Sequence, residues 1–261
     1  MDTRIAILSD LHGNPLALEA VLEDLQSQGG ADQYLILGDL AAIGYDPNGV
    51  LERLARLPST LFIRGNTDRY LVTGERPAPT AEDVRLNPGK LNRFQEIQCS
   101  FAWTQGAITA GGWFDWLASL PLEQRLTLPD GTRLLAVHAA PGTDDGLGVR
   151  PDMSEIELSS LAEGSQADLI LVGHNHWSLD LSANHVRFVN PGSLSNPFAP
   201  DLRASYALLI GDTSSYHIEW RRVDYDRQAV IRETQRVHHP AESFIVRYLT
   251  GQHQAPWAIK T

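Results

Sequence analysis

Short apolar runs that end in glycine or in a potential metal-binding residue constrain the fold of this chain more than any other feature. The first three runs lie at residues 4–9, 34–37 and 61–63, and segments with helical apolar spacing separate them. Runs of this length are typical of buried strands, whereas apolar residues at intervals of three and four are typical of helices. Strands that alternate with helices predict βαβ units and a parallel sheet.

The middle of the chain departs from this alternation. Residues 75–125 begin with prolines that break regular structure and continue with a helical pattern. This pattern carries three tryptophans, which we expect in the core rather than in a substrate wall: Trp103, Trp113 and Trp116. Predicted strands resume at residue 133. Because no repeat or linker is visible, we expect a single domain over 1–261, with a core at about 4–223, a helical insertion at about 75–125 and a C-terminal helical tail at 224–261.

The charge balance bears on the partners of the protein. The 21 Lys and Arg residues against 32 Asp and Glu residues give a net charge of −11. Nucleic-acid polymers and anionic membranes attract basic surfaces, so we expect neither as a partner. A small phosphorylated substrate is compatible with this charge, since bound cations can reverse the potential of an acidic site.

Targeting segments and cysteines bear on the location. No stretch approaches the roughly 20 apolar residues of a membrane span, and the apolar run before Ser9 is too short for a secretory signal. Cys99 is the only cysteine, which excludes an internal disulfide. We therefore expect a cytoplasmic protein without a membrane anchor. The sequence leaves the oligomeric state open.

Potential metal ligands gather at the ends of five predicted strands. Seven candidate ligands follow these strands: Asp10, His12, Asp39, Asn66, His138, His174 and His176. Each of them alone is a weak signal, because aspartate also caps helices and a single histidine is often a core residue. Side chains at the carboxyl ends of neighbouring strands converge on one crevice, so their joint placement predicts one metal site.

The chemistry of these residues favours two transition-metal ions. Mixed imidazole and carboxylate ligands suit Mn, Fe or Zn better than Ca or Mg, and we favour Mn. A carboxylate can bridge two cations about 3.5–4 Å apart, and the pair lowers the pKa of a shared water and neutralises a phosphate oxygen. The expected cofactors are therefore two divalent metal ions.

The sequence motifs that contain these seven residues resemble those of the calcineurin-like metallophosphoesterase superfamily, and within it the small bacterial phosphodiesterase branch. The family pattern D-x-H, G-D, G-N-H-[DE], H and G-H-x-H is matched at 10–12, 38–39, 65–68, 138 and 173–176. The resemblance implies an α/β fold with a two-sheet β-sandwich flanked by helices, in four layers. It also implies attack by a metal-bridging hydroxide, without a covalent phospho-enzyme. One metal would be held by Asp10, His12, Asp39 and His176, and the second by Asp39, Asn66, His138 and His174, with Asp39 as the bridge.

One position departs from the family pattern. Thr67 stands where most members have a histidine that orients the substrate or protonates the leaving oxygen. A threonine hydroxyl donates a hydrogen bond but has no pKa near 7, so rapid hydrolysis of esters with poor leaving groups is not expected. We place Asn66, Thr67 and Asp68 among the catalytic residues, and for Asp68 a cap on the following helix is an equal alternative.

These observations predict a metal-dependent phosphoric ester hydrolase. A phosphodiesterase that acts on small or activated diesters, such as a cyclic nucleotide or a dinucleotide, is the favoured function. The alternatives are a phosphomonoesterase, a dinucleoside polyphosphatase and a non-catalytic binding scaffold on the same fold. Two other polar groups are expected on solvated surfaces, namely the loop at Asp144 and Asp145 and the pair His238–His239.

Overall fold

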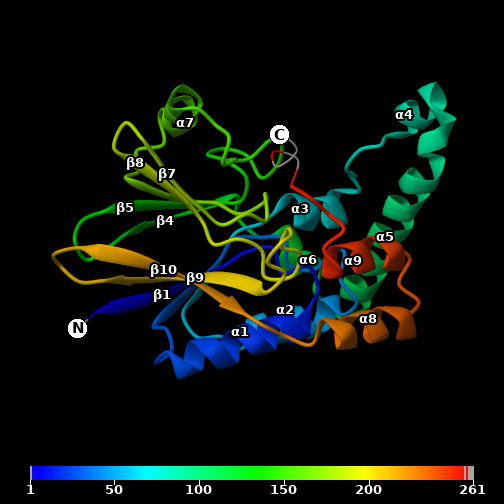
Figure 1. Ribbon diagram of the computed structural model, residues 1–261, viewed down its shortest axis with the longest axis horizontal. Helices are drawn as coiled ribbons and strands as arrows, with labels where there is room; N and C mark the ends of the chain where they lie inside the picture. The colour runs from blue at the N-terminus through cyan, green and yellow to red at the C-terminus, as the bar shows by residue number, and fades with distance from the viewer. Residues whose placement is uncertain (1, 256, 258–261) are drawn as a thin grey trace.

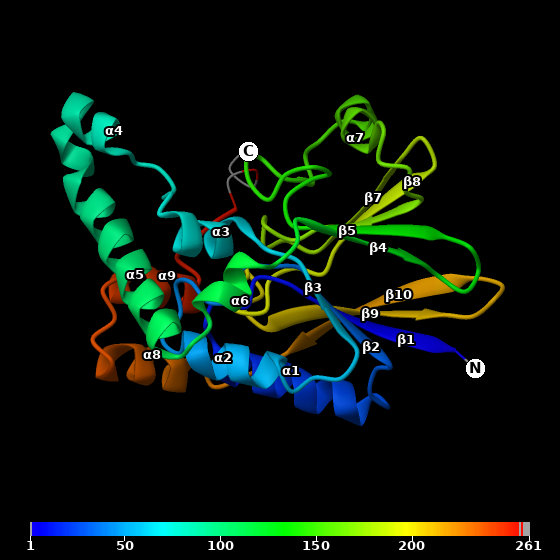
Figure 2. The same cartoon turned by 180° about the vertical axis from the view of Figure 1, so that it is seen from behind.

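Two five-stranded sheets face each other at the centre of the molecule, and helices cover their outer faces (Figures 1 and 2). The computed structural model describes residues 2–255 and 257. The sandwich that the family resemblance implied is confirmed.

The first sheet has the order β10-β9-β1-β2-β3. Its first three strands in the chain run parallel, as the alternation with helices predicted. β9 is antiparallel to β1, and β10 is antiparallel to β9. The bounds are β1 (Thr3–Leu8), β2 (Gln33–Ile36), β3 (Thr60–Phe62), β9 (Ala204–Gly211) and β10 (Tyr216–Val223).

The second sheet has the order β4-β5-β6-β8-β7. Its three inner strands are parallel, and the antiparallel strands β4 and β7 form the edges. The sequence did not indicate these two edge strands, because their apolar alternation is weak. The bounds are β4 (Glu123–Thr127), β5 (Arg133–Val137), β6 (Leu169–Leu171), β7 (Leu179–Ala183) and β8 (Val186–Asn190).

The alternation of side chains along β1 explains the layers. Ile5 and Ile7 point between the sheets and pack against the second sheet, whereas Ala6 and Leu8 belong to the cluster under the helices. A strand buried on both faces needs apolar residues at every position, which is why this segment reads as a continuous apolar run. The helices α1 (Pro15–Ser27) and α2 (Pro47–Leu54) cover the first sheet, and α7 (Glu155–Ala162) covers the second (Figure 1).

The remaining helices lie at one end of the sandwich. α3 (Asn66–Thr73) precedes the middle segment, which forms α4 (Ala81–Leu86), a 3-10 turn at Pro88–Lys90, α5 (Leu91–Ala110) and α6 (Phe114–Ala118). The tail forms α8 (Arg227–Arg236) and α9 (Glu242–Leu249), and α9 lies beside α5 in both views (Figures 1 and 2). Among the described residues, no helix has both the length and the apolar character that a bilayer span requires.

The three tryptophans of the middle segment lie in two different environments. Trp113 and Trp116 pack edge to face with each other, and Trp116 packs on Phe62 against the core. Trp103 lies on α5 with its ring 4.7 Å from that of His239. None of the three is among the residues that line the cleft described below.

Candidate metal centre

The loops after the parallel strands of both sheets meet at one end of the sandwich. Asp10 follows β1, Asp39 follows β2 and His138 follows β5. Backbone hydrogen bonds tie these loops together, with Asp10 N donating to Gly38 O at 3.2 Å and Gly173 N donating to His138 O at 2.8 Å. The site is therefore assembled from the carboxyl ends of strands in two different sheets.

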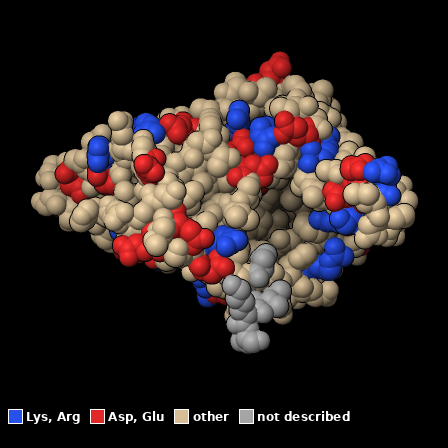
Figure 3. All heavy atoms as spheres, turned by 90° about the horizontal axis from the view of Figure 1, so that it is seen from above, with Lys and Arg blue, Asp and Glu red and all other residues tan. Residues whose placement is uncertain are grey.

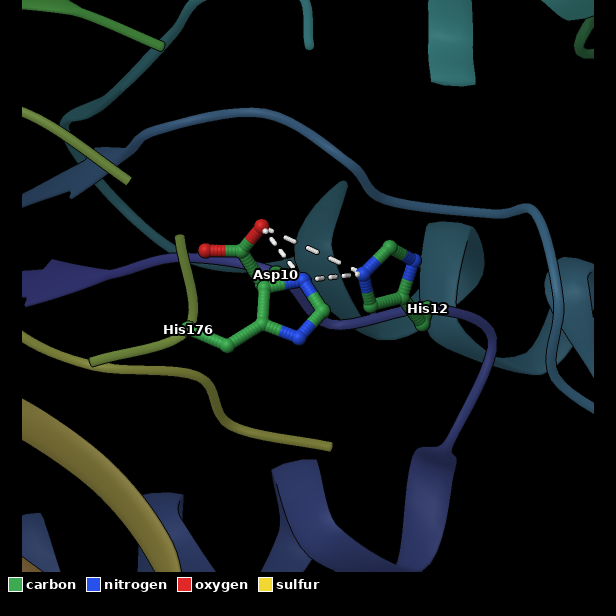
Figure 4. Close-up of side chains that lie close together, drawn as sticks. All are labelled: Asp10, His12 and His176. Atoms are coloured by element: carbon green, nitrogen blue, oxygen red, sulfur yellow. Dashed lines mark hydrogen bonds and ion pairs between the residues drawn. The ribbon is translucent and has the colours of Figure 1, made fainter. Parts of the chain in front are cut away.

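A first group consists of Asp10, His12 and His176 (Figure 4). The Nε2 atoms of the two histidines are 3.1 Å apart. Asp10 Oδ1 lies 3.3 Å from His176 Nε2 and 3.9 Å from His12 Nε2. Three potential ligand atoms, two from the loop after β1 and one from the loop after β6, thus point at a common position.

A second group surrounds Asn66, the first residue of α3. Its Oδ1 lies 3.2 Å from His138 Nε2 and 3.0 Å from His174 Nδ1. Asp39 lies between the two groups, because its Oδ1 is 3.5 Å from His138 Nε2 and its Oδ2 is 3.8 Å from His12 Nε2. The structure therefore brings all seven predicted ligands together, with Asp39 in the middle.

Each of the four histidines directs its second ring nitrogen at a backbone carbonyl. A carbonyl only accepts hydrogen bonds, so that nitrogen carries a proton. When the ring is neutral, its other nitrogen presents a lone pair to the group. This orientation of the ring is typical of histidines that bind metals. The pairs are His12 Nδ1 with Ala42 O, His138 Nδ1 with Leu37 O, His174 Nε2 with Gly146 O and His176 Nδ1 with Asn196 O, at 2.6–3.1 Å.

Burial and charge also fit a cation. Asp10 and Asp39 are buried, and Asp10 Oδ1 has no hydrogen-bond partner among the described residues. A buried carboxylate oxygen without a partner is costly, and a divalent cation can compensate it. The donor set therefore fits two divalent cations.

The protonation of the metal-free site follows the same electrostatics. Burial opposes the charge of Asp39, but His138 and His12 beside it outweigh burial and hold the pKa of Asp39 well below its usual range. Burial opposes the charge on His138 as well, yet Asp39 raises the pKa of His138 to about 10. A proton on His138 thus balances Asp39 in the absence of metal, and ligands of metals must give up such protons.

The backbone at this site is strained. Non-glycine residues rarely adopt positive φ, and the left-handed region costs about 1–2 kcal/mol per residue. Five of the seven candidate ligands adopt it, with φ between 45° and 68°: Asp10, His12, Asp39, His174 and His176. Strain of this kind concentrates at functional sites, where it aims side chains that regular structure would not bring together.

Thr67 and Asp68 contact the site in different ways. The backbone N–H of Thr67 donates to Asp39 Oδ1 at 2.9 Å, and its buried hydroxyl has no partner among the described residues. Asp68 accepts three backbone N–H groups, from Asp39, Leu40 and Gly65, at 2.8–2.9 Å. Burial, with the nearby Asp39, raises the pKa of Asp68 to about 7. Thr67 lines the cleft and Asp68 does not, which favours a positioning role for Asp68.

A cleft of about 260 Å³ opens beside the candidate ligands. Figure 3 shows the surface hollowed between the body of the molecule and the arm that carries α4 and α5. His12, Asp39, Asn66, His174 and His176 line one side of the cleft. The other side is formed by residues that the sequence did not single out: Arg93, Ile97, Phe101, Phe244 and Tyr248.

The loop with Asp144 and Asp145 is not simply solvated, contrary to the prediction. Asp144 is buried and accepts from Arg64 Nε at 2.7 Å and from Arg69 Nε at 2.9 Å. Asp145 pairs with Arg69 Nη2 at 2.9 Å and accepts from Tyr70. The loop also supplies Gly146 O, the acceptor for His174 Nε2 at 2.9 Å. Its role is to hold a candidate ligand in place.

The turn after β8 supports the site from behind. Asn190 Nδ2 donates to Gly173 O at 2.7 Å, and Ser193 Oγ donates to Asp10 O at 3.0 Å. From the sequence this segment reads as a simple turn. The signal in the sequence was the segment Asn190–Ser193 after the last histidine motif, which fits the family resemblance.

Comparisons with known proteins agree with this geometry. The model of the calcineurin-like phosphoesterase superfamily domain matches residues 3–214. An uncharacterized protein of Methanocaldococcus jannaschii is 28% identical over 241 residues, which cover 85% of this chain and 88% of that protein.

Two solved structures share the fold. A hypothetical protein of Pyrococcus horikoshii has a TM-score of 0.77 at 21% identity, and the match covers 94% of this chain and 98% of that one. A metallophosphoesterase of Sphaerobacter thermophilus has a TM-score of 0.73 at 24% identity, with 96% and 99% covered. At these identities the likeness concerns the fold. The match of the family model to most of the chain shows that this protein belongs to the calcineurin-like phosphoesterase superfamily.

Proposed function

We propose that this protein is a phosphodiesterase that uses two divalent cations and acts on small or activated phosphodiesters. The observation that carries the proposal is the set of ring nitrogens and carboxylate oxygens that present lone pairs to one another around Asp39. The first cation would be held by Asp10, His12, Asp39 and His176, and the second by Asp39, Asn66, His138 and His174.

The chemistry of the site depends on the two cations and on the residues that keep their ligands in position. Two such cations, with Mn favoured over Fe and Zn, supply a nucleophile from water near neutral pH and neutralise a phosphate oxygen. The protein keeps the ligands in position. The N–H of Thr67 orients Asp39, and Asp68 holds the backbone of the loop that carries Asp39. Thr67 lines the cleft, and its buried hydroxyl has no partner among the described residues.

Charge favours a diester over a monoester. A diester carries one negative charge, whereas a monoester carries nearly two at neutral pH and needs more positive charge around it. Arg93 is the only Lys or Arg among the described residues that line the cleft, and it pairs with Glu96 at 2.7 Å. Thr67 adds a second argument, since it cannot protonate a poor leaving group near pH 7.

Metal content and turnover test this proposal. Mn-loaded protein should hydrolyse bis-p-nitrophenyl phosphate faster than p-nitrophenyl phosphate. The variant Asp39→Asn should lose bound metal and at least about 100-fold in turnover, because it weakens both cation sites at once. The control is Asp115→Asn on an exposed position of α6, which should leave both unchanged.

Two results would contradict the proposal in different ways. Faster turnover of the monoester would favour a phosphomonoesterase. If the Mn-loaded protein hydrolyses neither ester and Asp39→Asn keeps the metal content of the wild type, the protein is a binding scaffold instead.

A further inference from the structure

The wall of the cleft that faces the candidate ligands is built by two segments far apart in the chain. On α5, Arg93, Ile97 and Phe101 recur at intervals of four residues and so lie on one face of the helix. On α9, Phe244 and Tyr248 follow the same spacing. The two helices contact each other through Ser243 Oγ, which donates to Glu96 Oε1 at 2.9 Å, and the middle segment and the tail therefore close over the same site.

The rings of this wall form a connected set that reaches the metal centre. The ring centroid of Tyr248 is 6.1 Å from that of His176 and 5.1 Å from that of Phe244. His253 stacks on Tyr248 at 4.1 Å. If the phosphate of a ligand lies at the histidines, the chemical group next to that phosphate lies against these aromatic side chains. Pockets lined by aromatic side chains favour planar, apolar ligand groups.

Among the described residues, the lining of the cleft offers no unpaired cation for a second phosphate. The guanidinium of Arg93 lies 4.5 Å from the ring centroid of Phe244 and pairs with Glu96. Its charge is therefore compensated, and it adds a flat surface to the aromatic set rather than a free anion site. Glu96 and the buried Ser100 also line this part of the cleft and supply polar groups for the edge of a planar ligand.

We propose that this wall binds a nucleobase, so that the substrate is a nucleotide ester with a single phosphate at the metal centre. The inference rests on the proposed function for the position of the phosphate. The volume of about 260 Å³ lies just below the range of about 300–1,000 Å³ of drug-sized ligand pockets, so it suits one nucleoside-sized group and not a polymer. Bases stack on aromatic rings and on guanidinium planes, and this contact tolerates different bases.

Calorimetry on the Mn-loaded protein tests the inference with AMP and ribose 5-phosphate. These ligands share the phosphate and the sugar and differ only in the base. AMP should bind about 5- to 150-fold more tightly, in line with the effect of one stacked base. Inorganic phosphate reports on the metal centre alone.

Two variants and a control assign the difference to the wall. Phe244→Leu and Tyr248→Leu change partly exposed residues, so the fold should tolerate them, and each should bring the ratio of the two affinities towards one. Phe114→Leu on α6 removes a partly buried ring outside the cleft and should leave the ratio unchanged.

The outcomes separate this inference from the proposed function. Equal affinities for AMP and ribose 5-phosphate, or a ratio that survives in both variants, would overturn it even if bis-p-nitrophenyl phosphate is hydrolysed. Tighter binding of ADP than of AMP would overturn the single-phosphate part. If neither AMP nor ribose 5-phosphate binds, the inference is also overturned. Hydrolysis of bis-p-nitrophenyl phosphate by the same preparation then reports whether the metal centre is active.

Discussion

Two histidines that are neighbours in the sequence lie in opposite environments. His238 is exposed, as predicted, whereas His239 is buried against Trp103 and accepts the N–H of Ala241 on Nδ1 at 3.1 Å. The prediction of a solvated pair was wrong for His239. The chain turns at His238, whose φ is 50°, and so directs successive side chains to different sides.

The burial of His239 predicts a dependence of stability on pH. Burial lowers the pKa of His239 to about 4, from an ordinary value of 6.5. The unfolded chain therefore takes up a proton before the folded protein does. The free energy of unfolding should fall as the pH drops from 6.5 to 4, by at most about 3 kcal/mol.

Urea denaturation between pH 7 and pH 4.5 measures this effect. The variant His239→Asn keeps an acceptor for the N–H of Ala241 but does not titrate, so its stability should change less with pH than that of the wild type. His238→Asn is the matched control and should follow the wild type. Parallel curves for His239→Asn and the wild type would contradict the prediction.

At the scale of elements, α3 holds the loop that positions His174. Arg69 on this helix binds the buried Asp144 and also Asp145. The same loop carries Gly146 O, which accepts the hydrogen bond from His174 Nε2. We expect Arg69→Met to lower the free energy of unfolding by about 1–3 kcal/mol, because it removes charge-assisted hydrogen bonds from a buried carboxylate. It should also weaken Mn binding by about 10-fold, since His174 loses its support.

Chemical denaturation and calorimetry with Mn²⁺ test the two parts of this prediction. Arg85→Met is the control, because Arg85 pairs with Glu82 on an exposed helix and such pairs contribute about 0–1 kcal/mol. Loss of stability with unchanged Mn affinity would show that the loop does not position His174.

The same elements show what the sequence can predict. The candidate ligands follow directly after predicted strands, so the motifs at 10–12 and 173–176 could be recognised from their joint placement in the sequence. The ion pairs of Asp144 could not, since Arg64 and Arg69 lie 80 and 75 residues away in the chain. Charged residues in a loop look solvated until the partner helix is known.

At the scale of the whole molecule, the site lies where the two sheets and the helices of the middle segment and the tail meet. The seven candidate ligands follow from local patterns after predicted strands, whereas the two-sheet sandwich was implied by the family resemblance alone. The aromatic wall does not, because Glu96 and Ser243 come together from positions 147 residues apart. Phe101 and Tyr248 read as ordinary apolar residues of amphipathic helices, and only their placement over the metal centre gives them a separate interpretation.

Metal binding should stabilise the whole fold, because the strained ligand loops connect both sheets. A ligand that binds only the folded state stabilises it by about 2.7 kcal/mol at 100 times its Kd. For a protein of this size, that corresponds to a rise in Tm of roughly 5–10 °C. Thermal unfolding with Mn²⁺ and after treatment with a chelator measures the difference.

The controls follow from the ligand set. Asp39→Asn should lose most of the rise in Tm, whereas Asp115→Asn should keep it. Ca²⁺ should give a smaller rise than Mn²⁺ at equal concentration, because four of the seven candidate ligands are imidazoles and Ca²⁺ prefers oxygen. A Tm that is the same with Mn²⁺ and with the chelator would contradict the prediction. The loops would then owe their left-handed backbone to packing alone, and the facing lone pairs around Asp39 would have to be satisfied by protons, as the raised pKa of His138 allows.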